Sequence, residues 1–176
     1  MASNQVLRQR QWTEQELRRS RLRYFPPRKQ LVMARVLSTA VGVLTTIEVL
    51  AAEKGDVMVY DPGDGREKPR IADFYHWPVK RDLFRNTYKP WDEPGWRPNP
   101  AESQLVLHGC RPYYKHIGVW AMLLKQPVLI QSLESPQPVE VPPGHWLVIG
   151  SEGEPYHMLD DKFRERYIVP DNNHRG

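Results

Sequence analysis

The sequence predicts a mainly β fold with short helices, in which two related small β modules pack as one pseudo-twofold unit preceded by a basic N-terminal helix. Residues 32–88 and 119–167 repeat one pattern of apolar and turn residues, and each copy closes on Phe-x3-Tyr. One copy alone has little core, so we expect the two copies to share one. The 17 prolines favour short strands over long helices, because proline removes a backbone donor and fixes φ.

The first 30 residues are expected to form a basic N-terminal arm with a helix at about 13–24. Thr13 as the N-cap and Glu16 three residues later make the pattern of a capping box. The helix is expected to end near Tyr24, because Pro26 disfavours helical geometry in the residue before it.

The first β module is expected over residues 31–90, where β-branched and apolar runs alternate with Gly and Asp turns. Its predicted elements are strands at 31–37, 41–50, 57–60 and 77–79, followed by one helical turn at 80–86. The second module, at 113–170, repeats this order. Its predicted strands lie at 118–124, 128–133, 146–149 and 156–158, before a helical turn through Phe163.

Two further segments flank the second module. Residues 91–112 are rich in Pro and Trp and are expected to form an ordered connecting strap. Residues 171–176 are polar and are expected to be a mobile tail.

The first copy has an inserted loop at 66–76 that the second copy lacks. Function often resides in such loops on a repeated scaffold. Its end gathers one acid, one imidazole and aromatic rings, as the pocket of a small ligand would: Asp73, Tyr75, His76 and Trp77. Packing of these rings in the core explains the same residues without any ligand.

The turn of each copy and its closing segment resemble the PGDYG family of uncharacterised bacterial and phage proteins, here as a tandem internal duplication. The turns are Lys-Gly-Asp-Val at 54–57 and Pro-Gly-His-Trp at 143–146, and the closing segments are 77–88 and 156–167. The first turn lacks the Pro of the family pattern, and the second has His in place of Asp. The resemblance implies a fold but no activity, because the family has no established catalytic residues to carry over.

Basic side chains in the arm are the strongest functional signal. Residues 1–35 hold nine Lys and Arg against two Glu, a net charge of +7, which leaves −3 for the rest of a chain of net charge +4. The candidate binding residues are Arg8, Arg10, Arg18, Arg19, Arg21, Arg23, Arg28 and Lys29. Such a helix can dock on acidic protein surfaces, attract phosphates, or simply be solvated.

These signals favour a non-catalytic interaction or regulatory protein of bacterial or phage type, whose β platform and Arg-rich helix dock an anionic or acidic partner. A protein partner is preferred, and an exposed strand edge makes a homodimer plausible. One alternative is a nucleic-acid-binding accessory protein that uses the same arm with the strap tryptophans as stacking surfaces. A second is a small-ligand-binding protein or enzyme that uses the loop at 66–77.

No catalytic residue, metal site or cofactor is expected. His108, Cys110 and His116 are zinc-binding residue types, but a structural zinc site needs four ligands. The sequence shows no apolar run of about 20 residues that could span a membrane and no secretory signal pattern. Together with a single Cys, this predicts a cytoplasmic protein without disulfides.

Overall fold

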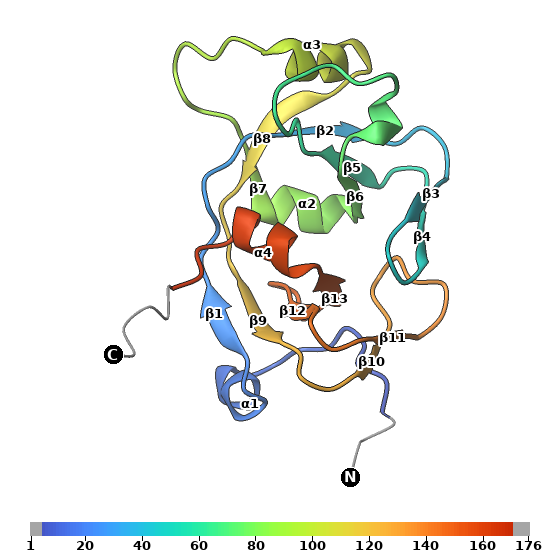
Figure 1. Ribbon diagram of the computed structural model, residues 1–176, viewed down its shortest axis with the longest axis vertical. Coiled ribbons are helices and arrows are strands. Elements are labelled where there is room, and N and C mark those ends of the chain that lie inside the picture. Colours follow the sequence, from blue (N-terminus) through green and yellow to red (C-terminus); the bar gives the residue numbers. More distant parts are fainter. Residues whose placement is uncertain (1–4, 171–176) are drawn as a thin grey trace. The chain divides into compact units, whose positions relative to one another are not determined.

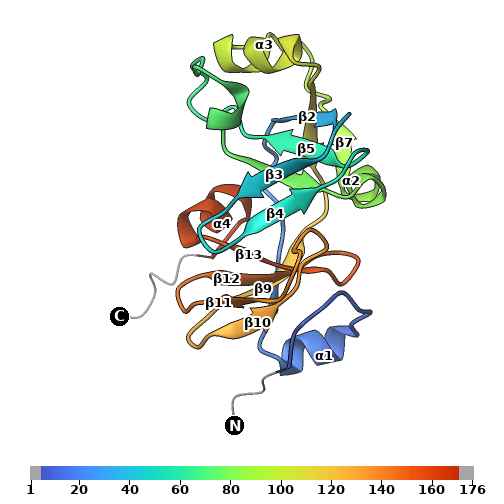
Figure 2. The ribbon, with the colours of Figure 1, turned by 90° about the vertical axis from the view of Figure 1, so that its right-hand side faces the viewer.

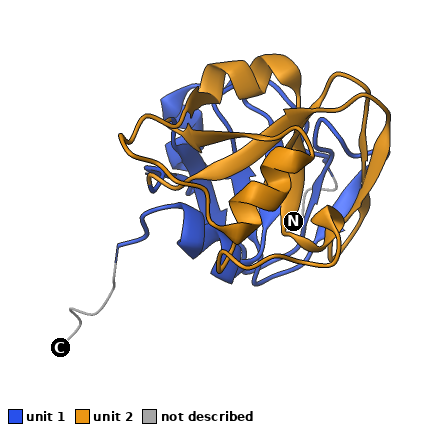
Figure 3. Ribbon diagram, turned by 90° about the horizontal axis from the view of Figure 1, so that it is seen from above, with its two compact units in different colours: residues 1–28, 117–176 blue, residues 29–116 orange. Residues whose placement is uncertain are grey.

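The computed structural model describes residues 5–170, which form two compact units (Figure 3). Unit 2 is the middle of the chain, residues 29–116. Unit 1 combines the segment up to residue 28 with the segment from residue 117 onward. The connecting strap predicted at 91–112 therefore belongs to unit 2. The tail predicted to be mobile at 171–176 lies outside the described residues, as do the first four residues of the arm.

Strands dominate both units, which confirms the predicted fold class. Residues 5–170 contain thirteen strands in four sheets, four α-helices and one 3-10 helix. Within the same residues, no helix has the length and apolar character needed to cross a membrane.

Unit 2 is built on a five-stranded antiparallel sheet, in the order β6-β5-β2-β8-β7. Figure 2 shows its separate β3-β4 hairpin. Its elements are β2 (Val32–Val36), β3 (Val41–Leu44), β4 (Val49–Ala52), β5 (Val57–Tyr60), η1 (Ile71–Asp73), β6 (His76–Val79), α2 (Arg81–Thr87), β7 (Tyr88–Pro90), α3 (Pro100–Leu107) and β8 (Arg111–Lys115). Alternate side chains of the sheet enter two clusters. One contains Phe84 of α2, and the other contains Leu105 of α3.

Two predictions for unit 2 were wrong in detail. The strand predicted at 41–50 is two strands, because Thr45 Oγ1 accepts a hydrogen bond from Glu48 N at 3.0 Å and turns the chain. The strap contains the unpredicted helix α3. Its N-cap, Asn99, accepts from Glu102 N at 2.8 Å and Pro100 occupies the first turn, so the residues that begin a helix were present in the sequence.

Unit 1 is built on a four-stranded antiparallel sheet, in the order β1-β9-β12-β13, with a separate β10-β11 pair (Figure 1). Its elements are α1 (Glu14–Arg19), β1 (Arg23–Phe25), β9 (Val119–Leu123), β10 (Val128–Ile130), β11 (Val139–Val141), β12 (Trp146–Ile149), β13 (Pro155–Met158) and α4 (Asp160–Arg166). Phe163 of α4 packs with Phe25, Val119 and Trp146 in one buried cluster.

The strand that precedes each predicted copy pairs with the other copy. β1 lies ahead of the first copy in the chain but pairs with β9, whereas β8 lies ahead of the second copy but pairs with β2. This exchange explains why unit 1 contains both outer parts of the chain.

Each unit contains local hydrogen bonds and ring contacts that have an equivalent in the other unit. β2-β3-β4-β5-β6-α2 in unit 2 follow the same order as β9-β10-β11-β12-β13-α4 in unit 1. Equivalent backbone bonds are Leu37 N to Asp56 O (2.8 Å) and Leu124 N to His145 O (2.9 Å), and Gly55 N to Leu37 O and Gly144 N to Leu124 O (both 2.9 Å). Equivalent ring pairs are Phe84 with Tyr88 (4.6 Å) and Tyr113 (5.0 Å), and Phe163 with Tyr167 (4.9 Å) and Phe25 (5.3 Å). The duplication and the pseudo-twofold packing stay predictions.

Candidate functional site

The N-terminal arm is integrated into unit 1 over residues 5–28. Leu7 N donates to Leu129 O at 2.9 Å, and Gln131 N donates to Leu7 O at 2.8 Å. Further along, Arg10 N donates to Gly153 O at 3.4 Å. The candidate binding residues are therefore presented from a bonded segment.

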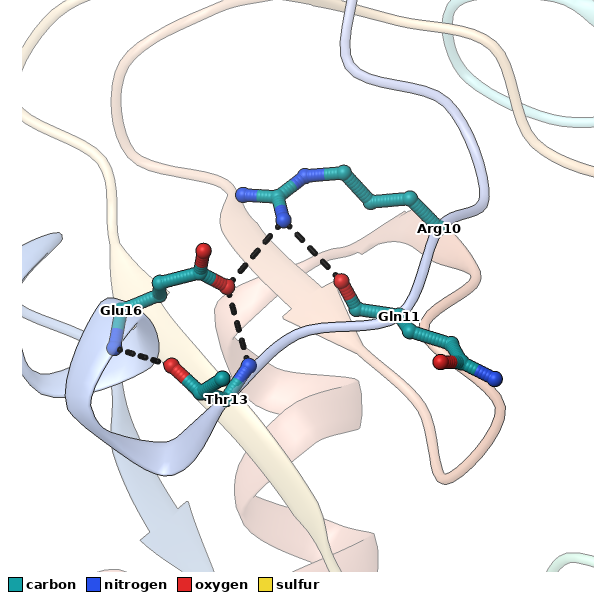
Figure 4. A network of polar contacts seen from close by, with 4 residues as sticks. All are labelled: Arg10, Gln11, Thr13 and Glu16. Atoms are coloured by element: carbon teal, nitrogen blue, oxygen red, sulfur yellow. Dashed lines mark hydrogen bonds and ion pairs between the residues drawn. The ribbon is translucent and has the colours of Figure 1, made fainter.

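Helix α1 begins as predicted. Glu16 N donates to Thr13 Oγ1 at 3.1 Å, and Thr13 N donates to Glu16 Oε2 at 2.9 Å, which completes the capping box (Figure 4). Arg10 also donates to Glu16 Oε2, at 3.2 Å, and to Gln11 O, at 3.0 Å. The hydrogen bond from the Thr13 backbone, followed by the bond from Arg10, lowers the pKa of Glu16. The Arg10 cation is thus held by the helix start.

The prediction that this helix ends near Tyr24 was wrong, because α1 ends at Arg19. Arg21 N donates to Arg18 O and Leu22 N donates to Leu17 O, both at 3.0 Å. These two bonds make a Schellman motif, in which Arg21 occupies the position that usually belongs to glycine. The φ angle of Arg21 is 66°, in the left-handed region. The chain can then turn into β1.

Five of the eight predicted basic side chains have partners inside the molecule. The contacts are Arg8 Nε to Gln131 Oε1 (3.1 Å), Arg10 to Glu16, Arg18 to Glu14 (2.5 Å), Arg28 Nε to Arg164 O (3.1 Å), and Lys29 Nζ to Asp92 (2.6 Å) and Glu93 (2.7 Å). The hydrogen bonds to Asp92 and then Glu93 raise the pKa of Lys29. Lys29 belongs to unit 2, whereas the other seven candidate residues belong to unit 1.

The remaining three arginines are Arg19, Arg21 and Arg23, which we call the Arg19–Arg23 segment. All three are exposed, and none of the three side chains forms a hydrogen bond or ion pair with another described residue. Beside them, Tyr24 is 52% exposed and its ring meets the ring of Trp120 edge-on at 6.0 Å. Three uncompensated guanidinium groups within five residues make this segment the strongest candidate site on the arm.

The predicted ligand pocket in the inserted loop is not assembled as a converging set of polar groups. Asp73 lies in η1 and accepts from Arg70 N at 3.0 Å. The His76 ring lies 2.7 Å from Phe74 O through Nδ1 and packs on the ring of Tyr60 at 5.5 Å.

The structure does bring Tyr75 and Trp77 together, with ring centroids 5.4 Å apart. Trp77 Nε1 also donates to Tyr88 Oη at 3.4 Å. The aromatic residues of the loop thus have structural contacts, and the two most polar residues bond within it.

The single cysteine lies in the core of unit 2. Cys110 is buried, and that burial raises the pKa of its thiol to about 12. The thiol is therefore protonated at neutral pH and unsuited to act as a nucleophile. Among residues 5–170, no group of three or more His, Cys, Asp or Glu side chains is placed to hold a metal ion.

Sequence reasoning missed a hollow in unit 2 beside α2. It has a volume of about 320 Å³ and is lined by Arg81 and Arg85 together with the apolar side chains of Val57 and Phe84. A signal was present in the sequence, since two arginines four residues apart share one face of a helix.

No protein-family model matches the chain, and neither does any curated protein or solved structure. The resemblance to the PGDYG family therefore stays a prediction.

Proposed function

We propose that this protein is a non-catalytic interaction protein that docks an acidic protein segment through Arg19, Arg21 and Arg23. The observation that carries the proposal is the backbone of Arg21, whose φ of 66° is strained for most residues with a side chain. Glycine or asparagine would fit that place in the helix end better. An arginine there has an exposed side chain without a partner among the described residues, so its use lies outside the fold.

An acidic protein segment suits this surface better than a nucleic acid does. Arg10, Arg18 and Lys29 are neutralised by carboxylates of the chain itself. Among the candidate binding residues, that leaves five guanidinium groups without a carboxylate partner: Arg8 and Arg28, which bond to neutral oxygens, and the three at the end of α1. Proteins that bind nucleic acid with high affinity commonly contact more phosphates than this, on the order of six to ten.

Binding to a fluorescein-labelled twelve-residue glutamate-rich peptide, followed by anisotropy across a salt series, tests the proposal. We expect the triple variant Arg19→Gln, Arg21→Gln, Arg23→Gln to bind at least about tenfold more weakly than the unmodified chain, because charge-assisted hydrogen bonds are lost. The matched control is Lys54→Gln, Arg97→Gln, Arg111→Gln, which removes the same charge from exposed positions in unit 2. It should bind within about twofold of the unmodified chain.

Equal losses in both triple variants would show that only net charge matters and would overturn the assignment. The same titrations with 20-nucleotide DNA and RNA test the alternative function, in which the partner is a nucleic acid. Binding of nucleic acid that is tighter than peptide binding and falls steeply with salt would replace the acidic segment as partner.

A single substitution at Arg21 tests its effect on stability separately from its effect on peptide binding. We expect Arg21→Gly to raise the free energy of unfolding by about 0.5–1 kcal/mol, because relief of the left-handed strain exceeds the entropic cost of glycine. Peptide binding should weaken in the same variant. Urea unfolding and anisotropy give the two quantities.

Arg19→Gly is the control, because Arg19 is the last residue of α1 and has no such strain. It should lower the free energy of unfolding, by up to about 1 kcal/mol. A loss of stability in Arg21→Gly as well would remove the observation on which the proposed function rests.

A further inference from the structure

The hollow in unit 2 lies between α2 and one face of the five-stranded sheet. Its apolar lining includes Ala34 and Val57 from the sheet and Phe84 from α2. Tyr113 meets Phe84 edge-on at 5.0 Å and extends the aromatic surface. With a volume of about 320 Å³, the hollow is at the lower end of the range that holds small organic ligands, about 300–1,000 Å³.

The equivalent place in unit 1 is filled by a tryptophan. Val57 and Trp146 occupy the same position, since each is the first residue of its strand and pairs with the last residue of β2 or β9. The Trp146 ring stacks on Phe163 at 4.0 Å, and its Nε1 donates to Asp160 at 2.8 Å. Valine cannot occupy that volume, so unit 2 keeps an opening where unit 1 has an indole.

The charges at this place also differ between the units. Counted from the equivalent phenylalanines, Arg81 takes the position of Asp160, and Arg85 that of Arg164. In unit 1 the two groups are paired, because Arg164 Nε donates to Asp160 at 2.9 Å. In unit 2 both positions are cationic, and neither arginine side chain forms a hydrogen bond or ion pair with any other residue between 5 and 170.

We propose that the hollow binds a small aromatic anion. Its ring would lie against Phe84 where the Trp146 ring lies in unit 1, and its anionic group would take the place of the Asp160 carboxylate. Arg81 and Arg85 then supply charge-assisted donors, which bind carboxylate or phosphate groups in fork geometry. Aromatic side chains stabilise a ring by offset stacking or edge contacts.

Three probes separate the ring from the charge. Indole-3-acetate has both, indole-3-acetamide has the ring without the charge, and acetate has the charge without the ring. In calorimetric titrations of the full chain, we expect indole-3-acetate to bind at least about tenfold more tightly than either of the others. Backbone amide signals of Ala34, Val57 and Phe84 should shift in two-dimensional NMR spectra. No binding of indole-3-acetate, or equal binding of the neutral amide, would overturn the proposal.

Variants test the position of the site. Val57→Trp with Arg81→Asp recreates the indole and carboxylate pair of unit 1, so it should remain folded and lose indole-3-acetate binding. Arg81→Gln with Arg85→Gln should reduce affinity at least about tenfold. Arg66→Gln with Arg97→Gln removes the same charge from exposed positions outside the lining of the hollow and should leave affinity unchanged. Full binding by the Val57→Trp, Arg81→Asp variant would place the ligand outside the hollow and overturn the proposal.

The Arg19–Arg23 triple variant should bind indole-3-acetate like the unmodified chain. This makes the ligand site independent of the proposed docking of an acidic partner, so that either can fail alone.

Discussion

Replacing Trp146 with valine should lower the free energy of unfolding by about 3 kcal/mol, because a large buried ring is removed and the space left behind cannot close fully. The Trp146 side chain is 5% exposed. Its ring stacks on Phe163 at 4.0 Å and meets Phe25 edge-on at 5.4 Å. Urea unfolding followed by circular dichroism measures the change.

Two controls identify the source of that loss. Trp120→Val makes the same chemical change at a partly exposed position of the same unit and should cost about 1 kcal/mol. Trp146→Phe keeps a ring but removes the donor to Asp160. Equal losses for Trp146→Val and Trp120→Val would mean that the buried stack contributes no more than an exposed ring.

The Trp146→Phe variant also has a pH signature. The hydrogen bond from Trp146, followed by the bond from Arg164, lowers the pKa of Asp160. A lowered folded pKa gives stability that is present above the unfolded value and is lost as the pH falls through the folded value. We expect NMR titration of Trp146→Phe to show the Asp160 pKa moving up toward its ordinary value, with a smaller loss of stability in acid.

Local signals in the sequence predicted local structure well. The pattern of Thr13 and Glu16 marked the start of α1, because both partners of the capping box lie within four residues. The two Phe-x3-Tyr segments are helices whose last backbone bond runs from Tyr88 N to Phe84 O and from Tyr167 N to Phe163 O. Each of these contacts is decided by neighbours in the chain.

The pairing of distant strands could not be read in the same way. β1 and β8 each pair with a strand of the other copy, and the sequence pattern of a three- to five-residue strand contains no information about its partner. The repeat itself suggested two consecutive modules, whereas the units exchange their leading strands. The end of α1 was missed because its stop signal is normally a glycine, and here it is Arg21.

In the candidate site, too, the sequence predicted local features but not contacts between distant residues. Composition alone placed the basic residues in the arm, but several of them bond to partners far away in the chain. Arg8 bonds to Gln131, 123 residues later, and Lys29 bonds to Asp92, 63 residues later. Only the fold distinguishes these from the three arginines at the helix end. The hollow beside α2 also depends on tertiary contacts, since it arises where a sheet residue is too small to fill the space under a helix.

Alanine at Gly153 should separate the N-terminal arm from unit 1 and lower the free energy of unfolding by about 2–4 kcal/mol, through backbone strain and a steric clash. The φ angle of Gly153 is 78°, and a Cβ atom there would lie only 1.7 Å from Arg10 O. Neither backbone can move aside cheaply, because Arg10 N donates to Gly153 O and Gly153 N donates to Gly150 O. The arm must shift or the turn must open.

Gly144→Ala isolates the clash from the strain. Gly144 has a similar φ of 88°, but a Cβ atom there would meet nothing within 4 Å, so this variant should lose only about 1 kcal/mol. Limited trypsin digestion gives a second readout, since an arm released by Gly153→Ala should be cleaved faster after Arg8 and Arg10 than the arm of the unmodified chain. If both glycine variants lose the same stability and are cleaved at the same rate, close packing between the arm and the turn at Gly153 is not what holds the arm in place. A larger loss of stability and faster cleavage in Gly153→Ala would instead show that contacts on both sides of α1 position the arginines at its end. These contacts are the packing of Arg10 on Gly153 before the helix and the β1-β9 pairing after it.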